Sequence, residues 1–372
     1  MSAALPDAFW PPADELTEAA ERIRATLGAW PRPAVRTRIC LAPPEQPRAA
    51  DLWVAIAGDA GAHAAQIARL NAAGAQAIVI DDASATLHTG AARHALASRA
   101  PLADDWIAAL AAFLDCGFAA SDALVLALAW RDGDEARGGD PWPVDPARFP
   151  RVLGLPAAPE PAFAPCPQRL GLYPVLPSAE WVERVLDCGV RTVQLRVKDA
   201  SPDTLRAEIE RAVAAGRRHP DARVFINDHW RLALDAGAYG VHLGQEDLET
   251  ADLGAIARAG ARLGLSSHGY YEMLVALQFK PSYLALGPVF ATATKAVAAP
   301  PQGLARLARY VRFAGPQAPL VAIGGIAPDT LGAVLAAGVG SAAVGSAAVV
   351  SAITAAADYR EAIAALQQNF GR

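Results

Sequence analysis

Polar and apolar side chains alternate in the segment Gln194-Leu195-Arg196-Val197-Lys198. Alternate residues of a β-strand face the same side, so its three polar side chains are expected to share one face. Arginine can donate two parallel N–H hydrogen bonds to an oxyanion, and lysine adds a mobile point charge. The segment therefore predicts a site for an oxyanion-rich ligand, and the alternative is an outward, solvated strand face.

Two carboxylates follow neighbouring apolar runs further along the chain. Asn227-Asp228 follows the run 224–226, and Asp247 follows the run 240–243. Mg²⁺ prefers few protein oxygens and completes its octahedron with water and substrate phosphates. We therefore predict that Asp228 and Asp247 hold Mg²⁺ beside the cationic segment. The alternative for each aspartate is an N-cap of the following helix, and Glu246 is left without a role.

Small and hydroxyl residues follow the later apolar runs. These segments are Thr292-Ala293-Thr294-Lys295, Gly324-Gly325 and Gly345-Ser346. Hydroxyls with a lysine can hold a second anion, and glycine-rich turns before a helix can present backbone N–H groups to a phosphate. A glycine pair alone often marks only a turn. His268 has no visible partner, so we expect a structural or supporting role for it.

The chain shows no convincing nucleophile and base pair. Two anion sites, one of them with Mg²⁺, suit displacement of pyrophosphate, because metal and cations stabilise the departing charge without a covalent enzyme intermediate.

Eight short apolar runs position these residues, and amphipathic segments separate them. The runs are 171–175, 192–195, 224–226, 240–243, 263–265, 283–286, 320–323 and 342–344. Eight strand–helix units in about 200 residues predict a (β/α)8 TIM barrel, with an open doubly wound sheet as the competitor. In a barrel, the polar residues would meet at the carboxyl ends of the strands.

A proline-rich segment divides the 372-residue chain. We predict a small α/β domain over 1–137, a linker over 138–167 and the barrel over 168–372. Within the first domain, we expect strands at 37–41, 52–57 and 77–80, and helices at 13–27, 62–73 and 106–114.

Composition excludes several functional classes. The chain is 53% hydrophobic and 19% charged, with a net charge of -5. No basic stripe suggests nucleic acid, no apolar stretch is long enough for a membrane, and no signal peptide is recognised. The four scattered cysteines are expected to be buried structural thiols in a reducing cytoplasm, with a redox or zinc role as the alternative. A homo-oligomer is left open.

Several motifs together resemble the thiamine phosphate synthase family over residues 170–365. They are Gln-Leu-Arg-x-Lys, Asn-Asp, Gly-Val-His-Leu-Gly-Gln-Glu-Asp, Gly-x-Ser-x-His, Gly-Pro-x-Phe-x-Thr-x-Thr-Lys and Ala-Ile-Gly-Gly-Ile. The resemblance implies that 4-amino-2-methyl-5-(diphosphooxymethyl)pyrimidine is joined to a thiazole phosphate, after departure of pyrophosphate leaves a pyrimidine-stabilised carbocation.

The resemblance also implies a role for each matching residue. The pyrimidine diphosphate would contact Gln194, Arg196, Lys198, Asn227, Ser266 and Lys295, of which Arg196, Lys198, Ser266 and Lys295 would act in catalysis. Asp228 and Asp247 would hold Mg²⁺. The thiazole phosphate would contact Thr292, Thr294, Gly325, Gly345 and Ser346.

This sequence departs from the family pattern at three places. Tyr173-Pro174-Val175-Leu176-Pro177 replaces the usual Thr-Asp end of the first strand, Ala291 replaces a proline, and Gly345 replaces a bulkier apolar residue. A related thiazole tautomerase and a silent precursor-binding module are the alternatives, but the complete diphosphate side favours the synthase. Residues 119–127 faintly resemble hydroxymethylpyrimidine phosphate kinases, although the Gly-Thr-Gly-Cys motif and its catalytic aspartate are absent. A degenerate kinase-like domain is the resulting expectation for the first part.

Overall fold

The computed structural model describes residues 8–56, 60–81, 84–90, 92–136, 139–292, 300–337 and 345–370. Two compact units divide between Pro156 and Ala157, inside the segment predicted as a linker. Much of that segment is ordered: Phe149 is buried in the first unit, and Phe163 is buried in the second. Its apolar side chains therefore contribute to two cores, a role that proline content alone did not indicate.

The first unit contains a mixed sheet with the strand order β1 to β7. Strands β1 to β4 are parallel, and β4 to β7 pair antiparallel. The strands are β1 Phe9–Trp10, β2 Arg38–Cys40, β3 Asp51–Ile56, β4 Gln76–Ile80, β5 Ser84–His88, β6 Arg93–Ala97 and β7 Arg151–Val152. The small α/β domain expected from the sequence is confirmed, and its antiparallel strands are additional to that expectation.

The helices of the first unit are α1 Asp14–Thr26, α2 Ala60–Ala72, α3 Trp106–Asp115 and α4 Ala120–Ala129, with short turns η1 Asp134–Ala136 and η2 Pro146–Arg148. Helix α3 packs against both α1 and α4. All residues of α3 except Ile107 are buried, which explains its nearly continuous apolar sequence.

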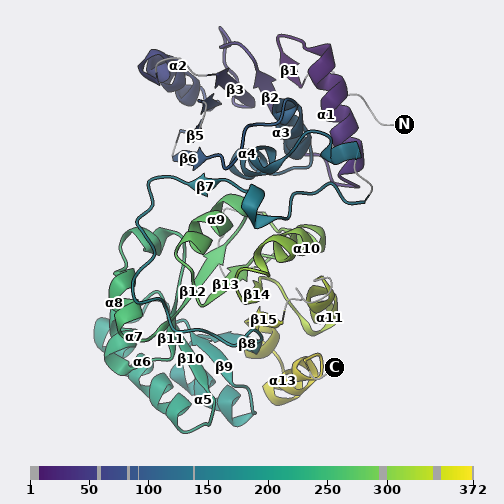
Figure 1. Cartoon of the computed structure of the whole chain (residues 1–372). Coiled ribbons are helices and arrows are strands. Elements are labelled where there is room, and N and C mark those ends of the chain that lie inside the picture. Colours follow the sequence, from purple (N-terminus) through teal and green to yellow (C-terminus); the bar gives the residue numbers. More distant parts are fainter. Residues whose placement is uncertain are drawn as a thin grey trace. The chain divides into compact units, whose positions relative to one another are not determined.

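The second unit is a closed barrel of eight described parallel strands, so the predicted (β/α)8 fold is confirmed (Figure 1). The strands are β8 Gly171–Leu176, β9 Thr192–Leu195, β10 Arg223–Asn227, β11 Gly240–Leu243, β12 Arg262–Ser267, β13 Tyr283–Leu286, β14 Leu320–Ile323 and β15 Ser346–Val349. Strand β15 pairs with β8 and closes the barrel.

Helical segments follow the strands and lie around the barrel (Figure 1). They are α5 Ala179–Asp187, α6 Pro202–Arg217, α7 Trp230–Ala236, η3 Glu246–Glu249, α8 Leu253–Arg258, α9 Tyr270–Gln278, α10 Gly303–Ala314, α11 Pro328–Ala336, α12 Ser351–Thr354 and α13 Tyr359–Gln367. Local sequence sets several helix starts: Ser178, Ser201 and Asp252 each accept a hydrogen bond from a backbone N–H of the first turn.

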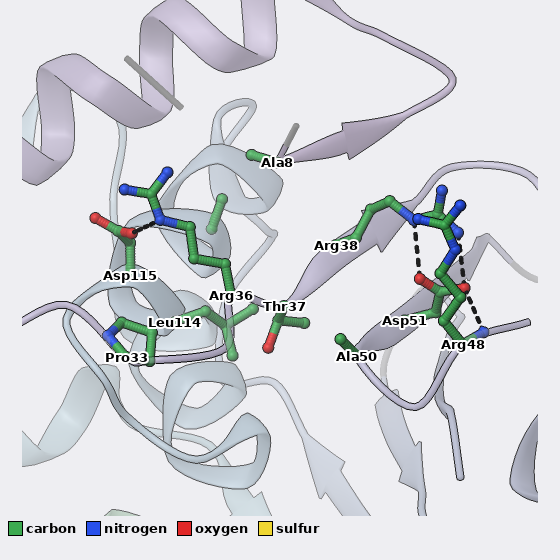
Figure 2. Close-up of a pocket in the computed structure, with 11 residues that line it drawn as sticks. Ala8, Pro33, Arg36, Thr37, Arg38, Arg48, Ala50, Asp51, Leu114 and Asp115 are labelled. Carbon is green, nitrogen blue, oxygen red and sulfur yellow. Dashed lines mark hydrogen bonds and ion pairs between the residues drawn. The ribbon is translucent and has the colours of Figure 1, made fainter. Parts of the chain in front are cut away.

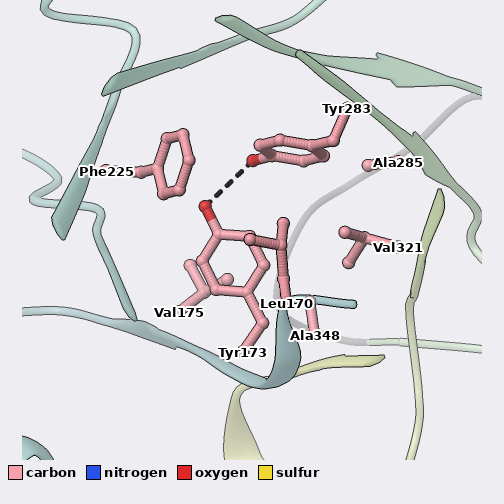
Figure 3. Close-up of a cluster of buried hydrophobic side chains, with 8 residues drawn as sticks. All are labelled: Leu170, Tyr173, Val175, Phe225, Tyr283, Ala285, Val321 and Ala348. Atoms are coloured by element: carbon pink, nitrogen blue, oxygen red, sulfur yellow. Dashed lines mark hydrogen bonds between the residues drawn. The ribbon is translucent and has the colours of Figure 1, made fainter. Parts of the chain in front are cut away.

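Aromatic rings fill the barrel interior, with Tyr173, Phe225 and Tyr283 at its centre (Figure 3). Glycines on neighbouring strands admit two of these rings. A Cβ atom at Gly264 would lie 2.1 Å from Tyr283 Cζ, and one at Gly240 would lie 2.5 Å from Phe225 Cε1. These two glycines therefore serve close packing, since any side chain there would displace a ring.

The last barrel strand differs from the prediction. The run 342–344 lies outside the described residues, and the strand that closes the barrel is Ser346–Val349. Both runs are small and apolar, so composition could not distinguish them. The register places Ser346 opposite Gly171, the first residue of β8, and this pairing fixes which run completes the barrel.

All four cysteines are free. Cys40 and Cys116 are buried as predicted, whereas Cys166 and Cys188 are only half-buried. Burial raises the pKa of the Cys40 thiol to about 11 and that of Cys166 to about 12, so both stay protonated near neutral pH. Within the described residues, no helix has both the length and the apolar character needed to cross a membrane.

Candidate active site at the strand ends of the barrel

A cavity of about 550 Å³ opens at the carboxyl ends of the barrel strands. Its lining comes from residues at or just after the last residue of most strands, which is where barrel folds carry ligand sites. The predicted site residues that line it are Gln194, Arg196, Asn227, Asp228, Asp247, Ser266, Thr292 and Gly325. The fold thus brings together most of the site that the sequence indicated.

The cationic segment only partly follows its predicted geometry. Strand β9 ends at Leu195, although the backbone N–H of Arg196 still donates to Leu176 O at 2.8 Å. Gln194 and Arg196 therefore line the cavity on the predicted face. Lys198 lies beyond the strand, is exposed and is not part of the cavity lining, so the prediction that all three share one cavity is wrong for Lys198. Side chains alternate between the two faces only while the backbone is a paired strand, and this pairing ends before Lys198.

Asn227 and Asp228 lie together at the end of β10. Asn227 is the last strand residue, and the backbone N–H of Asp228 donates to His242 O at 2.9 Å on the neighbouring strand. Asp228 has a φ of 61°, a left-handed conformation that is uncommon outside glycine but that aspartate tolerates. Such strained backbone at a cavity is typical of a functional position.

Asp247 approaches the same cavity from the loop after β11. One of its carboxylate oxygens, Oδ2, accepts a hydrogen bond from Gly244 N at 2.8 Å. This bond orders the loop, but it is not the N-cap bond of the alternative prediction, because an N-cap side chain accepts from an N–H later in the chain and Gly244 precedes Asp247. Oδ1 and the second lone pair of Oδ2 are not used by this bond, and a carboxylate has about four acceptor positions. Asp247 can therefore order the loop and face a cation together.

Glu246 also lines the cavity, next to Asp247. Among the described residues, no group of three or more His, Cys, Asp or Glu side chains is arranged to hold a metal ion. Asp228 and Asp247 are two carboxylates that line one cavity, and a metal ion held by them alone would need further oxygens from water or a ligand. That pattern fits Mg²⁺ better than a metal enclosed by protein.

The turn after β14 supports the other side of the cavity. Gly324 and Gly325 have φ values of 102° and 63°. A Cβ atom at Gly324 would lie 2.5 Å from Pro288 Cα, and one at Gly325 would lie 2.5 Å from Ala291 O. Both glycines are therefore required by backbone conformation and by close approach to the 288–291 loop. They bring backbone to the cavity wall beside Thr292.

Gly345 and Ser346 do not belong to this cavity, so their predicted role at the strand end is wrong. They lie at the start of β15, and Ser346 Oγ accepts a hydrogen bond from Leu170 N at 2.8 Å. A Cβ atom at Gly345 would meet Arg169 rather than the cavity. Val349, Val350 and Ser351 line the cavity instead. The predicted residues Thr294 and Lys295 lie outside the described residues.

A repeated pentapeptide explains this error and offers the signal that was missed. Gly-Ser-Ala-Ala-Val occurs at 340–344 and again at 345–349. The prediction used the first copy as the strand, and the structure uses the second. The second copy lies five residues after the first. The residues that follow the strand are therefore Val350 and Ser351, and not Gly345 and Ser346. The repeat itself would have warned that two runs compete for one strand.

His268 and His242 have different surroundings. His268 Nδ1 lies 2.7 Å from Glu272 Oε2, and the same oxygen accepts from His268 N at 2.8 Å, so His268 is held by its own helix start, in line with the predicted supporting role. His242 Nε2 lies 2.9 Å from Ser266 Oγ, and its Nδ1 lies 2.7 Å from Tyr283 Oη. Because His242 and Tyr283 are 41 residues apart in the chain, sequence reasoning did not identify this contact.

A smaller cavity of about 260 Å³ lies in the first unit (Figure 2). Two of the three arginines that line it, Arg36 and Arg38, have carboxylate partners. Arg38 makes two 2.8 Å hydrogen bonds to Asp51, and Arg36 Nε lies 3.5 Å from Asp115, which is 5% exposed. These two guanidinium charges are therefore paired within the cavity wall, as expected of a structural cluster.

The fold and the strand-end cavity define a (β/α)8 barrel with a polar, charged site at the carboxyl ends of its strands. Residues 172–348 match the model of the family described as thiamine monophosphate synthase. A thiamine-phosphate synthase of Salmonella paratyphi A is 56% identical over 207 residues, 56% of this chain and 95% of that protein. The one from Cronobacter sakazakii is 56% identical over 211 residues, 57% of this chain and 97% of that protein.

Among solved structures, thiamine phosphate pyrophosphorylase from Pyrococcus furiosus is 31% identical, covering 54% of this chain and 96% of that chain, with a TM-score of 0.48. The sequence relatives decide the assignment. The chain belongs to the thiamine-phosphate synthase family, and it is a transferase of thiamine biosynthesis.

Proposed function

We propose that the barrel joins 4-amino-2-methyl-5-(diphosphooxymethyl)pyrimidine to a thiazole phosphate and releases pyrophosphate, with Mg²⁺ bound to Asp228 and Asp247. The observation that carries this proposal is one cavity lined by Arg196, by both aspartates and by Thr292. A guanidinium, two carboxylates and a hydroxyl in one cavity suit a diphosphate ester that binds with Mg²⁺ beside an anionic co-substrate.

The diphosphate end of the first substrate is assigned to Arg196, with Asn227 as a neutral hydrogen-bonding partner. A guanidinium can hold two oxyanions in parallel, and it stays charged throughout the pH range of a cell. When bound at the two carboxylates, Mg²⁺ would neutralise negative charge on the diphosphate. Lys295 remains a proposed second cation for this group, and Lys198 is proposed only as an approaching charge, because it lies outside the cavity lining.

The reaction divides into two bond changes. The bond between the methylene carbon and the diphosphate oxygen breaks, and both electrons leave on pyrophosphate. The electron-rich aminopyrimidine ring stabilises the resulting carbocation, and the thiazole nitrogen then supplies its lone pair to form the new C–N bond. Arg196 lowers the barrier because it favours the charge that develops on the leaving group. No enzyme nucleophile is needed.

The thiazole phosphate is assigned to the side of the cavity formed by Thr292, Gly325 and Ser351. Thr292 and Ser351 offer hydroxyl donors, and Gly325 brings backbone to the wall where a side chain would collide with Phe290 and Ala291. Thr294 stays a proposed contact. Ser351 replaces Gly345 and Ser346 in this proposal, because it lines the cavity and they do not.

The test is release of pyrophosphate by the full chain with both substrates and Mg²⁺. Formation of thiamine phosphate in equal amount is expected. A tautomerase would convert the thiazole without releasing pyrophosphate, and a silent binding module would bind a precursor without turnover. Either result from folded wild-type protein would overturn the proposal.

A further inference from the structure

We propose that Tyr173, Tyr283 and His242 form a buried hydrogen-bond relay that orients Gln194 and Ser266 to recognise the donor–acceptor edge of an aminopyrimidine ring. This inference rests on the proposed function and extends it to side chains that do not touch the diphosphate. Two of the three, Tyr173 and Tyr283, lie in the centre of the barrel with their hydroxyls facing each other (Figure 3).

The relay consists of four consecutive contacts. Gln194 Nε2 donates to Tyr173 Oη at 3.3 Å, and Tyr173 Oη lies 2.9 Å from Tyr283 Oη. Tyr283 Oη lies 2.7 Å from His242 Nδ1, and His242 Nε2 lies 2.9 Å from Ser266 Oγ. Both ends, Gln194 and Ser266, line the cavity. Side chains of five strands thus connect two points of the cavity wall through the barrel interior.

The tyrosines act as neutral hydroxyls. Tyr173 is 1% exposed and Tyr283 is 0% exposed, and burial raises the pKa of each hydroxyl well above its ordinary value. Each tyrosine therefore donates one hydrogen, and a neutral imidazole donates from one nitrogen and accepts at the other. These rules restrict the direction in which hydrogens can be passed along the relay.

The amide of Gln194 selects one direction. If Gln194 donates to Tyr173, then Tyr173 donates to Tyr283, and Tyr283 donates to His242 Nδ1. His242 Nε2–H then donates to Ser266 Oγ. In the reverse direction, the Tyr173 hydroxyl would face the N–H of Gln194 and have no acceptor within the relay, which is costly for a buried group. The selected direction makes Ser266 a hydrogen donor to the cavity and leaves Gln194 Oε1 as an acceptor.

The fold makes specific room for this arrangement. In the strand register, Gly264 lies opposite both His242 and Tyr283. Because Gly264 has no Cβ, the Tyr283 ring crosses β12 and stacks on His242 with an interplanar angle of 18°. A phenylalanine would fill the same space without a buried hydroxyl that needs a partner. Packing alone therefore explains the rings but not the two facing hydroxyls.

The chemistry of the ligand follows from the two relay ends. In a 4-aminopyrimidine, a ring nitrogen that accepts hydrogen bonds is adjacent to an exocyclic amine that donates them. Ser266 would donate to the ring nitrogen, and Gln194 Oε1 would accept from the amine. Gln245 Nε2 donates to Ser266 O at 2.6 Å, which fixes the backbone of Ser266 as well. Tyr173, Tyr283 and His242 are positioning residues, because they act through these two.

The test compares Tyr283→Phe and Tyr173→Phe with Tyr310→Phe in the full chain. Tyr310 is a matched control, because it is buried and its hydroxyl donates to Gln302 Oε1 at 3.0 Å, outside the relay. We expect about a tenfold rise in KM for the pyrimidine diphosphate in each relay variant. The KM for the thiazole phosphate and the Kd for pyrophosphate should stay within about twofold, because the relay ends contact the ring.

A spectroscopic measurement separates this role from simple packing. Nitrogen-15 NMR of the wild-type histidines should show His242 protonated at Nε2 and unprotonated at Nδ1, with its signals assigned by their loss in His242→Gln. Tyr283→Phe should shift His242 toward the other tautomer. Two results would overturn the relay if the wild type turns over. One is the opposite tautomer of His242 in the wild type, and the other is an equal KM for the pyrimidine diphosphate in Tyr283→Phe and Tyr310→Phe. Absence of wild-type turnover would instead overturn the proposed function.

Should the relay variants fail to fold, the wild-type tautomer still decides the question. A second wild-type measurement uses the pyrimidine diphosphate without its 4-amino group. The relay predicts at least about tenfold weaker binding of this analogue, since a buried acceptor would lose its donor. Equal binding of the two compounds would contradict the assigned direction.

Discussion

Ser346 Oγ accepts a hydrogen bond from the backbone N–H of Leu170 at 2.8 Å, and this contact joins the start of the last barrel strand to the residue before the first. Both residues are buried, and Ser346 is 1% exposed. The contact satisfies a backbone donor at the end of the barrel opposite the cavity. It therefore assigns Ser346 to barrel closure, whereas Ser351, five residues later, faces the ligand site.

Replacing Ser346 with alanine should lower the free energy of unfolding by about 1–3 kcal/mol, because the N–H of Leu170 would lose its buried acceptor. The KM values should stay near those of the wild type. Ser351→Ala should show the converse: unchanged stability and about a tenfold rise in KM for the thiazole phosphate. Urea denaturation and steady-state kinetics on both variants measure this, and a KM effect confined to Ser346→Ala would refute the corrected assignment.

Asp228→Asn and Asp247→Asn should each weaken the apparent affinity for Mg²⁺ by more than roughly 100-fold. Loss of a residue that only supports a metal ligand typically weakens affinity by roughly 10–100-fold, and a direct ligand should matter more. Asparagine tolerates the left-handed backbone of position 228, and it can still accept from Gly244 N at position 247. The measurement is turnover against Mg²⁺ concentration.

Asp252→Asn is the matched control for these variants, because Asp252 Oδ1 accepts from Ala255 N at 2.8 Å at the start of α8, outside the cavity lining. Its Mg²⁺ dependence should equal that of the wild type. Wild-type Mg²⁺ dependence in both Asp228→Asn and Asp247→Asn would exclude the two carboxylates as ligands.

The Arg38–Asp51 pair predicts a pH-dependent contribution to stability in the first unit. Burial raises the pKa of Asp51. Hydrogen bonds from Arg38 and from Arg48 N, together with the charges of both arginines, lower this pKa by more than burial raises it, so it lies below the ordinary 3.8. A lowered carboxyl pKa contributes stability above the ordinary value, and this contribution is lost as the pH falls through the folded value.

Asp51→Asn should therefore lower the free energy of unfolding by roughly 3 kcal/mol at pH 7, because it removes one partner of a buried pair. The difference from wild type should decrease as the pH falls below 3.8. Denaturant titrations of both proteins at pH 7 and near pH 3 provide the comparison. An equal difference at both pH values would show that the carboxylate charge is not what stabilises this unit.

Removal of residues 1–156 should leave pyrophosphate release by the barrel within about threefold of the full chain. The segment 157–167 must be kept, because Ser282 Oγ donates to Ala164 O at 2.7 Å and accepts from Leu263 N at 2.9 Å, and because Cys166 packs against the barrel core. Deletion of residues 1–168 should lower the melting temperature markedly. Loss of activity in the shorter deletion, with an unchanged melting temperature, would assign the first unit a part in catalysis.

Much of the site could be predicted from the sequence, because the position of a residue relative to a barrel strand determines the end of the barrel at which it lies. A polar residue just after an apolar run lies at the cavity once the run is a strand, and the positions of Arg196, Asp228 and Asp247 follow from this rule. It failed for Lys198, where strand pairing had already ended. The resemblance to the family supplied the chemistry of the substrates, which periodicity cannot provide.

The sequence by itself determined the (β/α)8 class, the two-part chain and the kinds of groups at the strand ends. These features depend on local hydrophobic patterns and on motif order, which can be recognised without knowing any contact between distant residues. Only the tertiary structure decided which copy of Gly-Ser-Ala-Ala-Val is the last strand. Both copies have the same local preference, and only pairing with β8 distinguishes them. The relay from Gln194 to Ser266 depends on contacts between residues far apart in the chain, so only the closed barrel could reveal it.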